Sequence, residues 1–371
     1  MLADTLARYR NDCKVFAYAR KDQQRNVTLP YVYKPMWSAW LFPFEIFKES
    51  IRSGIDLVHI QFEFVTFGSI ASSVLVILLL LLLRISGIKT VVTLHGPIMG
   101  SAEQGDLLDS LLPSRAAVPK SLVKPFVLVF YRIVALLSSA IIVHAEVFRR
   151  CLIHSGIRKC AIIPHGVQVG PLDPMQDPSS VPDKPHEILF FGFISPRKGL
   201  ESLINAVKEV NSSGTACRLT IAGKESPYYP DYRGRLEALS QRTCPGTMVR
   251  FIGFVADEEL PHLFTLADLI ALPYEYSISA SGPLALALQF GKAVVCTDTQ
   301  YFREVLGMEY RGFLVRPRSP SGLAKTIESV LESNTVRARL EATSKSIAKR
   351  DSWDVVGHQT LELYLKVLNC R

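Results

Sequence analysis

Residues 188–200 read ILFFGFISPRKGL, an apolar strand that runs into a turn carrying two adjacent cations. The strand is continuously hydrophobic, which is typical of a parallel strand buried on both faces. Arg197 and Lys198 follow at the point where a helix is expected to begin. A helix start leaves backbone N–H groups unpaired and carries partial positive charge, so cations placed there favour an anion. This stretch therefore predicts a diphosphate site at the end of a parallel strand.

A second turn of similar character, SASGP at 279–283, follows the apolar run 269–272. Small residues let a phosphate approach the backbone closely. Pro283 suits the first position of a helix that we expect over residues 284–290. The two turns are predicted to hold one diphosphate from two sides.

Apolar runs of strand type alternate with helical patterns along the whole chain. In the first half they fall at 13–19, 57–60, 90–94, 140–144 and 161–164, and in the second at 188–193, 219–222, 249–252, 269–272, 293–297 and 313–315. Such alternation predicts parallel sheets covered by helices on both faces. We therefore expect an α/β protein with two doubly wound sheets, whose ligand-binding ends meet in an interdomain cleft.

The domain boundary is predicted from composition. Residues 171–185 contain five prolines and little apolar content, which indicates a linker between a domain of residues 1–170 and a domain of residues 186–350. The final segment, 351–371, has apolar residues at helical spacing and predicts a closing helix. That helix is expected either to pack back across the linker or to lie at the periphery.

The composition excludes several classes of protein. With 371 residues and 48% hydrophobic content, the chain has enough core for two to three domains and is neither disordered nor fibrous. Seven cysteines lack metal-ligand spacing and no secretory signal opens the chain, which favours a cytoplasmic protein with reduced thiols. No Asp-x-Asp motif or His/Asp cluster provides a divalent-cation site, so we expect no metal and no other cofactor. No nucleic-acid partner is expected.

The positive charge belongs to the first half of the chain. Residues 1–170 hold 19 Lys and Arg against 11 Asp and Glu, whereas the remainder holds 23 of each kind. This asymmetry suits an anionic membrane surface or a phosphorylated partner, and an ordinary solvated face is the alternative. The segment VPKSLVKPFVLVFYRIVALL (118–137) places cations among large apolar residues, which favours a lipid-linked or membrane-surface substrate unless the domain buries that face.

One stretch is long enough to span a bilayer. Residues 64–83 carry no charge over 20 positions, the length that a transmembrane helix requires. However, Gly68 and three serines dilute its first half, and it lies between two strand-like runs. We therefore interpret it as a buried crossover helix.

Taken together, these motifs resemble the nucleotide-sugar glycosyltransferases of the GT-B fold, specifically retaining family 4. The similar stretches are FFGFISPRKGLESLINAV (190–207), RLTIAGK (218–224), VRFIGFVADEELPHLFTLADLIALPY (249–274) and SGPLALALQFGKAVVCTD (281–298), with weaker ones at DLVHIQFEF (56–64), VVTLHG (91–96) and IIPHGV (162–167). The resemblance covers most of the chain and implies two Rossmann-like domains. The first would bind the acceptor and the second the nucleotide-sugar donor.

The resemblance implies a donor site in the second domain. Lys198 matches the lysine that contacts the donor diphosphate, and Ser281 and Gly282 match the loop whose backbone amides hold the distal phosphate. The neighbouring donor-site residues would be Gly192, Arg197, Glu275 and Pro283. Arg197 is displaced from the usual arginine position, which Phe193 occupies in this chain.

In the first domain, His95 matches a histidine that ends a strand and borders the reacting sugar, and Gly96 follows it. His59 and Glu63 lie at another strand end and are expected to face the same cleft. Each histidine has an alternative interpretation as a capped or core imidazole. His165, in IIPHGV, is expected to be a residue of the hinge turn.

The chain departs from the family pattern at two places. Two glutamates that the family usually carries correspond to Ile278 and Leu286, so Glu275 is the nearest acid. The family's opening strand and its glycine-rich acceptor loop are also not found, so the first domain is expected to lack the usual first strand. These departures put catalytic activity and the acceptor site in question.

The resemblance implies a hexosyltransferase that moves a sugar from a nucleotide diphosphate to an acceptor hydroxyl with retention of configuration. His95, Lys198 and Arg197 would be its catalytic residues. The acceptor would be a sugar, a lipid or a polysaccharide precursor, and the protein would be cytoplasmic or peripheral on the inner face of the membrane. Two alternatives stay open: a nucleotide-sugar 2-epimerase, which shares the fold but needs several cleft carboxylates, and a non-catalytic glycosyltransferase-like partner subunit.

Overall fold

The computed structural model describes residues 1–9, 15–16, 32–33, 40–64, 67, 70–97, 120–169, 184–226, 229–244, 246 and 248–369. These residues belong to two compact units. Unit 1 comprises Met1–Gly166, Ile278–Ala280 and Trp353–Arg371, and unit 2 comprises Val167–Ser277 and Ser281–Ser352. Most of the expected linker and most of the strand expected at 13–19 lie outside the described residues.

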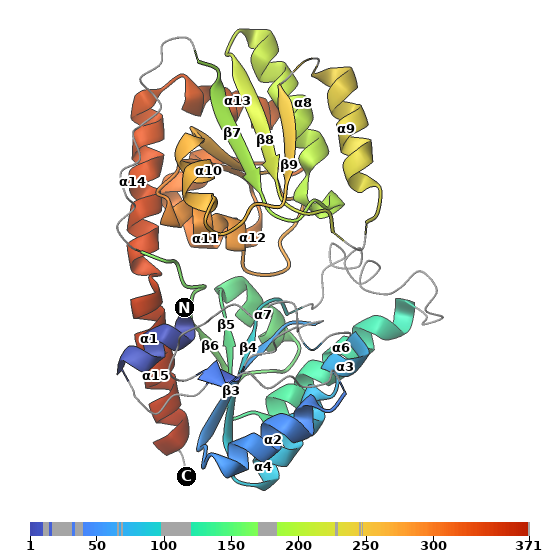
Figure 1. Ribbon diagram of the computed structural model, residues 1–371, viewed down its shortest axis with the longest axis vertical. Helices are drawn as coiled ribbons and strands as arrows, with labels where there is room; N and C mark the ends of the chain where they lie inside the picture. The colour runs from blue at the N-terminus through green and yellow to red at the C-terminus, as the bar shows by residue number, and fades with distance from the viewer. Residues whose placement is uncertain are drawn as a thin grey trace. The chain divides into compact units, whose positions relative to one another are not determined.

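Unit 1 contains a four-stranded parallel sheet in the order β3-β4-β5-β6 and a separate parallel pair, β1 and β2 (Figure 1). Its strands are β1 (Val15–Phe16), β2 (Val32–Tyr33), β3 (Leu57–Phe62), β4 (Lys89–Leu94), β5 (Ala140–Val143) and β6 (Cys160–Ile162). Its helices are α1 (Leu2–Tyr9), α2 (Phe42–Arg52), α3 (Ile70–Ser73), α4 (Val76–Ile85), α6 (Lys120–Leu137), α7 (Glu146–His154) and α15 (Trp353–Asn369).

The apolar stretch 64–83 ends in a crossover helix, as its sequence predicts. Helix α4 packs against β4 and has α2 and α6 as neighbours. It buries Val76, Leu79, Leu80 and Leu83 completely. In the part of the chain that the structure describes, no helix is long and apolar enough to cross a membrane.

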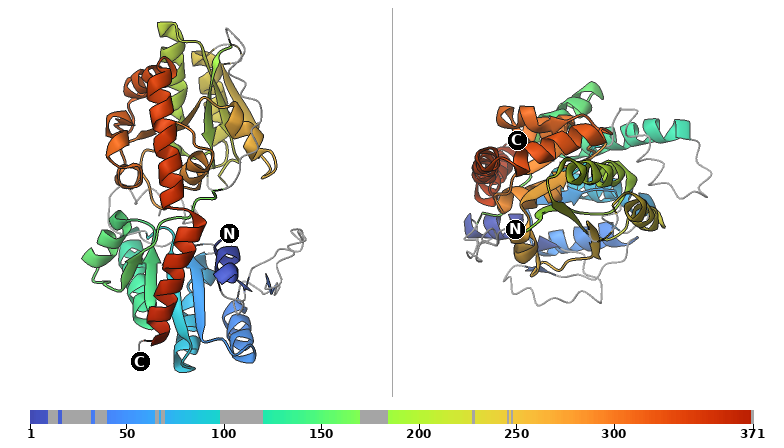
Figure 2. Two further views of the ribbon diagram at one scale, coloured as in Figure 1. Left: turned by 90° about the vertical axis from the view of Figure 1, so that its left-hand side faces the viewer. Right: turned by 90° about the horizontal axis from the view of Figure 1, so that it is seen from above.

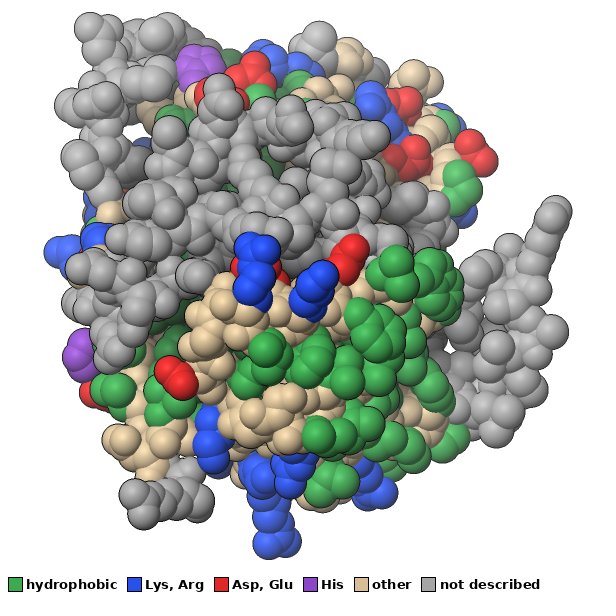
Figure 3. Space-filling model, turned by 60° about the horizontal axis from the view of Figure 1, so that its bottom comes forward, with side chains coloured by type: hydrophobic (Ala, Val, Ile, Leu, Met, Phe, Trp, Pro, Cys, Tyr) green, Lys and Arg blue, Asp and Glu red, His purple; other side chains and the backbone are tan. Residues whose placement is uncertain are grey.

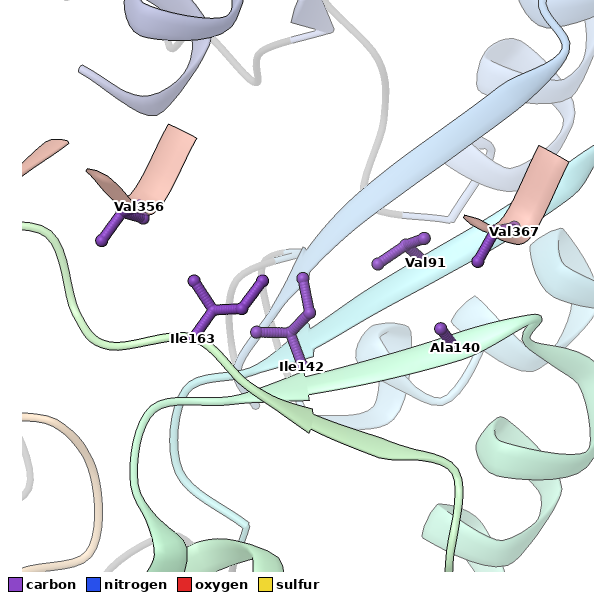
Figure 4. Packing of buried hydrophobic residues seen from close by; sticks show 6 residues of the cluster. All are labelled: Val91, Ala140, Ile142, Ile163, Val356 and Val367. Carbon is purple, nitrogen blue, oxygen red and sulfur yellow. The ribbon is translucent and has the colours of Figure 1, made fainter. Parts of the chain in front are cut away.

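The C-terminal helix α15 covers the other face of this sheet (Figure 2). Figure 4 shows Val356 and Val367 of α15 near apolar side chains of β4 and β5 and the residue after β6, in one buried cluster. Helix α1 packs against α15. The predicted closing helix therefore exists, and it belongs to unit 1.

Unit 2 is a six-stranded parallel sheet in the order β12-β11-β10-β7-β8-β9. Its strands are β7 (His186–Phe191), β8 (Cys217–Ala222), β9 (Val249–Gly253), β10 (Leu269–Leu272), β11 (Val294–Thr297) and β12 (Leu314–Val315). Its helices are α8 (Leu200–Ser213), α9 (Tyr232–Thr243), α10 (Leu260–Leu266), α11 (Gly282–Gln289), α12 (Gln300–Leu306), α13 (Pro320–Leu331) and α14 (Asn334–Arg350), with 3₁₀ helices η4 (Pro196–Lys198) and η5 (Met308–Phe313).

Helices cover both faces of the unit 2 sheet, as a doubly wound fold requires. Helices α8, α9 and α13 pack together, while α11, α12 and α14 form the other layer (Figure 1). Strand β7, which precedes the Arg197–Lys198 turn, lies in the middle of the sheet between β10 and β8. The carboxyl ends of β7 and β10 are therefore neighbours, and each leads into one of the two predicted diphosphate turns.

Candidate active site

The first turn of unit 2 places its cations in a 3₁₀ helix rather than in the first turn of a long helix. After β7 the chain passes through Gly192, at φ +136°, and enters η4. Gly199 then adopts a left-handed conformation at φ +68°, and α8 begins only at Leu200. A Cβ on Gly199 would lie 2.0 Å from the carbonyl oxygen of Pro273, so only glycine permits this approach.

Lys198 is the buried cation of this turn. Its side chain is only 5% exposed, and Nζ lies 3.5 Å from the centroid of the Tyr274 ring. The Tyr274 hydroxyl is 3.1 Å from Oγ of Ser281. Lys198, Tyr274 and Ser281 therefore form a connected group, here called the Lys198 group, that joins the first turn to the second.

The electrostatics of the Lys198 group follow from burial. Loss of water lowers the pKa of Lys198 well below its usual value, and the nearby Arg197 lowers it further. Burial also raises the pKa of Tyr274 to about 12, so its hydroxyl stays protonated. The two turns also lie close to each other, because a Cβ added at Gly192 would be only 3.1 Å from Cγ of Pro283. The two predicted turns thus lie together.

Ser281 is the N-cap of α11. Its Oγ accepts a hydrogen bond from the Leu284 N–H at 3.2 Å, while its own N–H donates to the Tyr301 hydroxyl at 3.2 Å. The sequence predicted Pro283 at the first position of this helix. The helix begins at Gly282, so Pro283 holds the second position instead. A Cβ on Gly282 would meet nothing within 4 Å. The open space at this helix start therefore lies beside Gly282, whereas the Ser281 amide already has a protein partner.

Glu275 and Arg197 are linked through the backbone. The Glu275 N–H donates to the Arg197 carbonyl at 2.8 Å, and the Glu275 carboxylate forms an ion pair with Arg318 at 2.6 Å. At the position of the family's usual arginine, Phe193 is 61% exposed. Ile278, at the position of one of the family's glutamates, is buried. Glu275 is therefore an acid near the turn, but its carboxylate already contacts an arginine.

In unit 1, histidines gather at the carboxyl end of the sheet. His59 lies on β3, and His95, His144 and His165 follow β4, β5 and β6. Nε2 of His144 is 3.1 Å from Nδ1 of His95, and Nε2 of His95 is 2.8 Å from the side-chain amide of Gln61. That amide also lies 3.2 Å from Nε2 of His59. One hydrogen-bonded chain therefore connects three of the four imidazoles.

The ends of this chain fix the direction of its hydrogen bonds. Nδ1 of His144 faces the Ile163 carbonyl at 2.9 Å and must donate, so Nε2 of His144 accepts from Nδ1 of His95. Nε2 of a neutral His95 then carries a lone pair. The Gln61 amide oxygen lies 2.8 Å from this nitrogen, and two acceptors cannot form a hydrogen bond, so a neutral chain requires the amide turned by 180°, with its NH₂ toward His95.

The opposite end of the chain involves the C-terminal helix. The Tyr364 hydroxyl, on α15, is 2.5 Å from Nδ1 of His59. Nε2 of His59 is 2.7 Å from Oγ1 of Thr93. With Tyr364 donating to Nδ1, His59 is the tautomer that donates to Thr93 through Nε2. Helix α15 thus contributes to the histidine chain as well as to the core.

The histidines are neutral at physiological pH. Burial, followed by the proximity of His95, lowers the pKa of His59 to about 3, and burial with the nearby His165 lowers that of His95 to about 4. Burial and the neighbouring His95 and His165 lower the pKa of His144 to about 3. Burial also lowers the pKa of His165. Neutral imidazoles can both donate and accept hydrogen bonds, which suits contact with hydroxyl groups.

We expect unit 1 to lose stability as the pH falls from about 7 to about 6. The unfolded histidines titrate near 6.5, whereas the folded ones bind protons only near 3 to 4, so acid favours the unfolded state. The loss for three histidines is about 2 kcal/mol over that interval. Thermal unfolding followed at each pH measures it. In the variant H144Q the slope of the unfolding free energy against pH should fall by about a third. An unchanged slope would contradict the assignment of His144 as a neutral, buried histidine.

The other predicted residues of the first domain lie close to the same sheet edge. Glu63 is exposed directly after β3. The Gly96 carbonyl accepts a hydrogen bond from the Tyr131 hydroxyl at 3.4 Å. Nδ1 of His165 lies 3.1 Å from the Gly166 carbonyl, and its ring contacts that of Trp353. His165 thus occupies the turn after β6, where the chain leaves unit 1.

Several residues that belong to the Lys198 group or the histidine chain, or contact them, were not predicted from the sequence. The side chains of Tyr274, Tyr301, Gln61 and Tyr364 each contact a predicted residue. Of the missed residues, His144 carried a usable signal, because it directly follows a buried strand just as His95 does. Within the described residues, no group of three or more His, Cys, Asp or Glu is placed to hold a metal ion.

Comparison with known proteins assigns the two halves of the chain to related families. Residues 1–170 match the family model described as Glycosyltransferase Family 4, and residues 173–347 match the one described as Glycosyl transferases group 1. An uncharacterised glycosyltransferase of Methanocaldococcus jannaschii is 30% identical over 186 residues, which cover 50% of this chain and 46% of that protein. A phosphatidyl-myo-inositol mannosyltransferase of Mycobacterium leprae is 30% identical over 206 residues, 54% of this chain and 52% of that protein. The chain spans about half the length of the curated relatives it matches.

Solved structures show the same fold at lower identity. Sucrose-phosphate synthase from Thermosynechococcus elongatus superposes with a TM-score of 0.75 at 18% identity, covering 100% of this chain and 92% of that chain. Anabaena HepE, solved in complex with UDP-glucose, gives a TM-score of 0.71 at 18% identity. The superposition covers 98% of this chain and 94% of that chain. Two family models that together reach from residue 1 to residue 347 agree with the two parallel-sheet units. This protein belongs to the family 4, group 1 glycosyltransferases and has their GT-B fold.

Proposed function

We propose that this protein transfers a hexose from a nucleotide diphosphate sugar to an acceptor hydroxyl, with retention of configuration. The observation that carries the proposal is the Lys198 group, which joins the turns after neighbouring strands β7 and β10. The match of residues 173–347 to the group 1 family supports a donor site in unit 2. HepE, which has the same fold and was solved with UDP-glucose, also supports a nucleotide-sugar donor.

In this proposal, unit 2 stabilises the leaving diphosphate. As the bond to the sugar breaks, negative charge grows on the diphosphate, and fixed cations and amide dipoles lower the barrier. Lys198 and the Gly282 N–H at the start of α11 would supply them, with Arg197 beside Lys198. Because an opposite charge favours the protonated form, a bound diphosphate would raise the lowered pKa of Lys198. The acceptor proton can pass to the leaving phosphate, so the proposal includes neither a protein base nor a metal.

We assign the acceptor and the sugar hydroxyls to unit 1. A neutral His95 offers an acceptor nitrogen, Nε2, that faces the Gln61 side-chain amide. A hydroxyl group of a ligand could donate to this nitrogen beside the amide or in its place. His59, Glu63 and Gly96 lie near the same sheet edge. The proposed acceptor is a lipid-linked or polysaccharide precursor. The relative named phosphatidyl-myo-inositol mannosyltransferase favours the lipid class, and reduced cysteines favour a cytoplasmic location.

Thermal unfolding in the presence of a panel of UDP and GDP sugars tests the donor. We expect one of them, together with its free nucleoside diphosphate, to stabilise unit 2. A ligand at about 100 times its Kd adds about 2.7 kcal/mol to the free energy of unfolding. Uridine and guanosine, which lack the diphosphate, are the matched controls and should have little effect. The anomeric configuration of the product, measured by proton NMR, tests retention.

Other outcomes of the same panel would favour the alternatives. If no nucleotide sugar stabilises the protein and none is consumed, a non-catalytic partner subunit becomes the better assignment, in line with the apolar Ile278 and Leu286 at the positions of the family's glutamates. Conversion of a nucleotide sugar without any acceptor would favour a 2-epimerase.

A further inference from the structure

Three neighbouring helices of unit 1 expose large apolar side chains on their outer side. Helix α4 lies between α2 and α6, and contacts both. The side chains that define this apolar face, each between 41% and 75% exposed, are Phe44 and Ile51 of α2, Leu81 and Ile85 of α4, and Val129 and Leu136 of α6. Figure 3 shows hydrophobic side chains gathered over this region, with Lys and Arg side chains along its border.

The exposure is not a by-product of an ordinary amphipathic pattern. A surface helix normally turns polar residues outward. Helix α4 has the sequence VILLLLLLRI and buries one side completely, so its outer side is apolar apart from Arg84. In α6, Val127, Phe130 and Val134 face inward, yet the outer side still carries Val129 and Leu136. Contiguous exposed apolar surface of this kind marks an interaction site in a soluble protein.

The charges around the apolar face are predominantly positive. Among the side chains that the structure describes, the three helices carry the cations Lys48, Arg52, Arg84 and Arg132 and the acids Glu45 and Glu49. Arg84 donates a hydrogen bond to the Leu136 carbonyl at 3.0 Å, which places a guanidinium beside the apolar side chains at the ends of α4 and α6. One of the two acids, Glu49, already pairs with Arg52. The surface thus combines exposed apolar groups with an excess of cations.

We propose that the apolar face of α2, α4 and α6 docks the protein peripherally on an anionic lipid bilayer. The apolar side chains would enter the boundary between headgroups and acyl chains, while the surrounding cations contact lipid phosphates. Trp40, two residues before α2, and Phe126 of α6 are 60% and 47% exposed. Aromatic side chains favour the level of the headgroups. None of the described helices is long and apolar enough to cross the bilayer, so the contact is with one surface.

The positive charge around the apolar face favours an anionic bilayer over a second copy of the chain as its partner. A symmetric dimer would place the same patch on both sides of the interface, so the cations of α2, α4 and α6 would face their own copies. Like charges set against one another oppose association. An anionic surface instead complements them.

The docking surface goes beyond the proposed glycosyl transfer and does not depend on it. Its residues lie in unit 1, whereas the Lys198 group lies in unit 2. Membrane binding and donor turnover can therefore fail separately. A protein that binds vesicles but turns over no nucleotide sugar would retain the docking surface and lose the proposed activity.

Vesicle flotation of the full chain tests the proposal. We expect the protein to float with vesicles in which a third of the lipid is phosphatidylglycerol, to float poorly with pure phosphatidylcholine, and to be released in part by high salt. The double variant F44S/I85S should bind at least about tenfold more weakly, because two exposed large side chains no longer enter the bilayer. K48Q should lower binding to anionic vesicles by about fivefold.

Leu365 and Leu368 provide the matched control. They are 42% and 41% exposed on α15, on the other side of the same sheet, so L365S/L368S should leave flotation unchanged. Thermal unfolding of each variant shows whether it is folded. Equal binding to neutral and anionic vesicles, or undiminished binding by folded F44S/I85S, would overturn the proposal. So would a solution dimer that F44S/I85S dissociates, because the apolar face would then belong to a second copy.

Discussion

Replacing Lys198 with Met should lower kcat/KM for sugar transfer by roughly 10²–10³-fold, the usual cost of removing one group that stabilises transition-state charge. Lys198 is 5% exposed and lies over the Tyr274 ring, so Met keeps most of the packing while it removes the cation. The same variant should unfold at an equal or higher temperature. A buried charge lowers stability through its lost hydration, and an apolar side chain of similar volume does not.

Activity and stability are therefore expected to move independently in this variant. Lys325 of α13 is exposed, and K325M serves as the matched control for loss of a lysine from unit 2. K325M should retain donor turnover. Unchanged turnover by K198M would show that Lys198 does not contact the donor diphosphate. Calorimetry with UDP or GDP then reports whether the change affects binding as well as the chemical step.

Replacing Gly199 with Ala should destabilise unit 2 by about 3–5 kcal/mol, because it combines backbone strain with a steric clash. Gly199 has φ +68°, a conformation that alanine adopts with difficulty. Its new Cβ would also lie 2.0 Å from the Pro273 carbonyl oxygen, at the start of the turn that follows β10. Relief of that clash must move the Lys198 turn away from Pro273, so donor affinity should fall together with the unfolding temperature.

Gly214, at the other end of α8, separates the two causes. It has φ +110°, but a Cβ there would meet nothing within 4 Å. G214A should therefore cost only about 1 kcal/mol, through backbone strain alone, and should leave donor affinity intact. Urea unfolding of G199A and G214A compares them directly. Similar losses in the two variants would show that the contact with Pro273 is of no consequence.

The strands of this fold could be predicted from the sequence, because parallel strands that are buried on both faces are continuous apolar runs. The runs at 57–60, 90–94 and 188–193 correspond to β3, β4 and β7, within a few residues at each end. Local backbone geometry was less predictable. The cations after β7 lie in a 3₁₀ helix because Gly199 adopts a left-handed conformation, and nothing in the local pattern distinguishes that turn from a helix start.

The candidate site was predictable only where a residue follows a strand. His95 and Lys198 both stand just beyond buried apolar runs, and parallel strands bring such positions to one edge. Contacts between distant segments gave no comparable signal. Tyr364 bonds His59 from 305 positions away, and Tyr274 supports Lys198 from the end of another strand. Both tyrosines look like ordinary core residues in the sequence, because their hydrogen-bond partners are set by tertiary packing.

The placement of α15 has a consequence for how the chain folds during translation. Val356 and Val367 complete a buried cluster with Val91, Ala140 and Ile142, so the sheet of unit 1 lacks this cover until α15 has been synthesised. Unit 2 has all its strands and helices by Ser352 and can fold while α15 is still inside the ribosome. Unit 1 is thus begun before unit 2 but completed after it, and until α15 emerges one face of its sheet exposes apolar side chains that chaperones can bind.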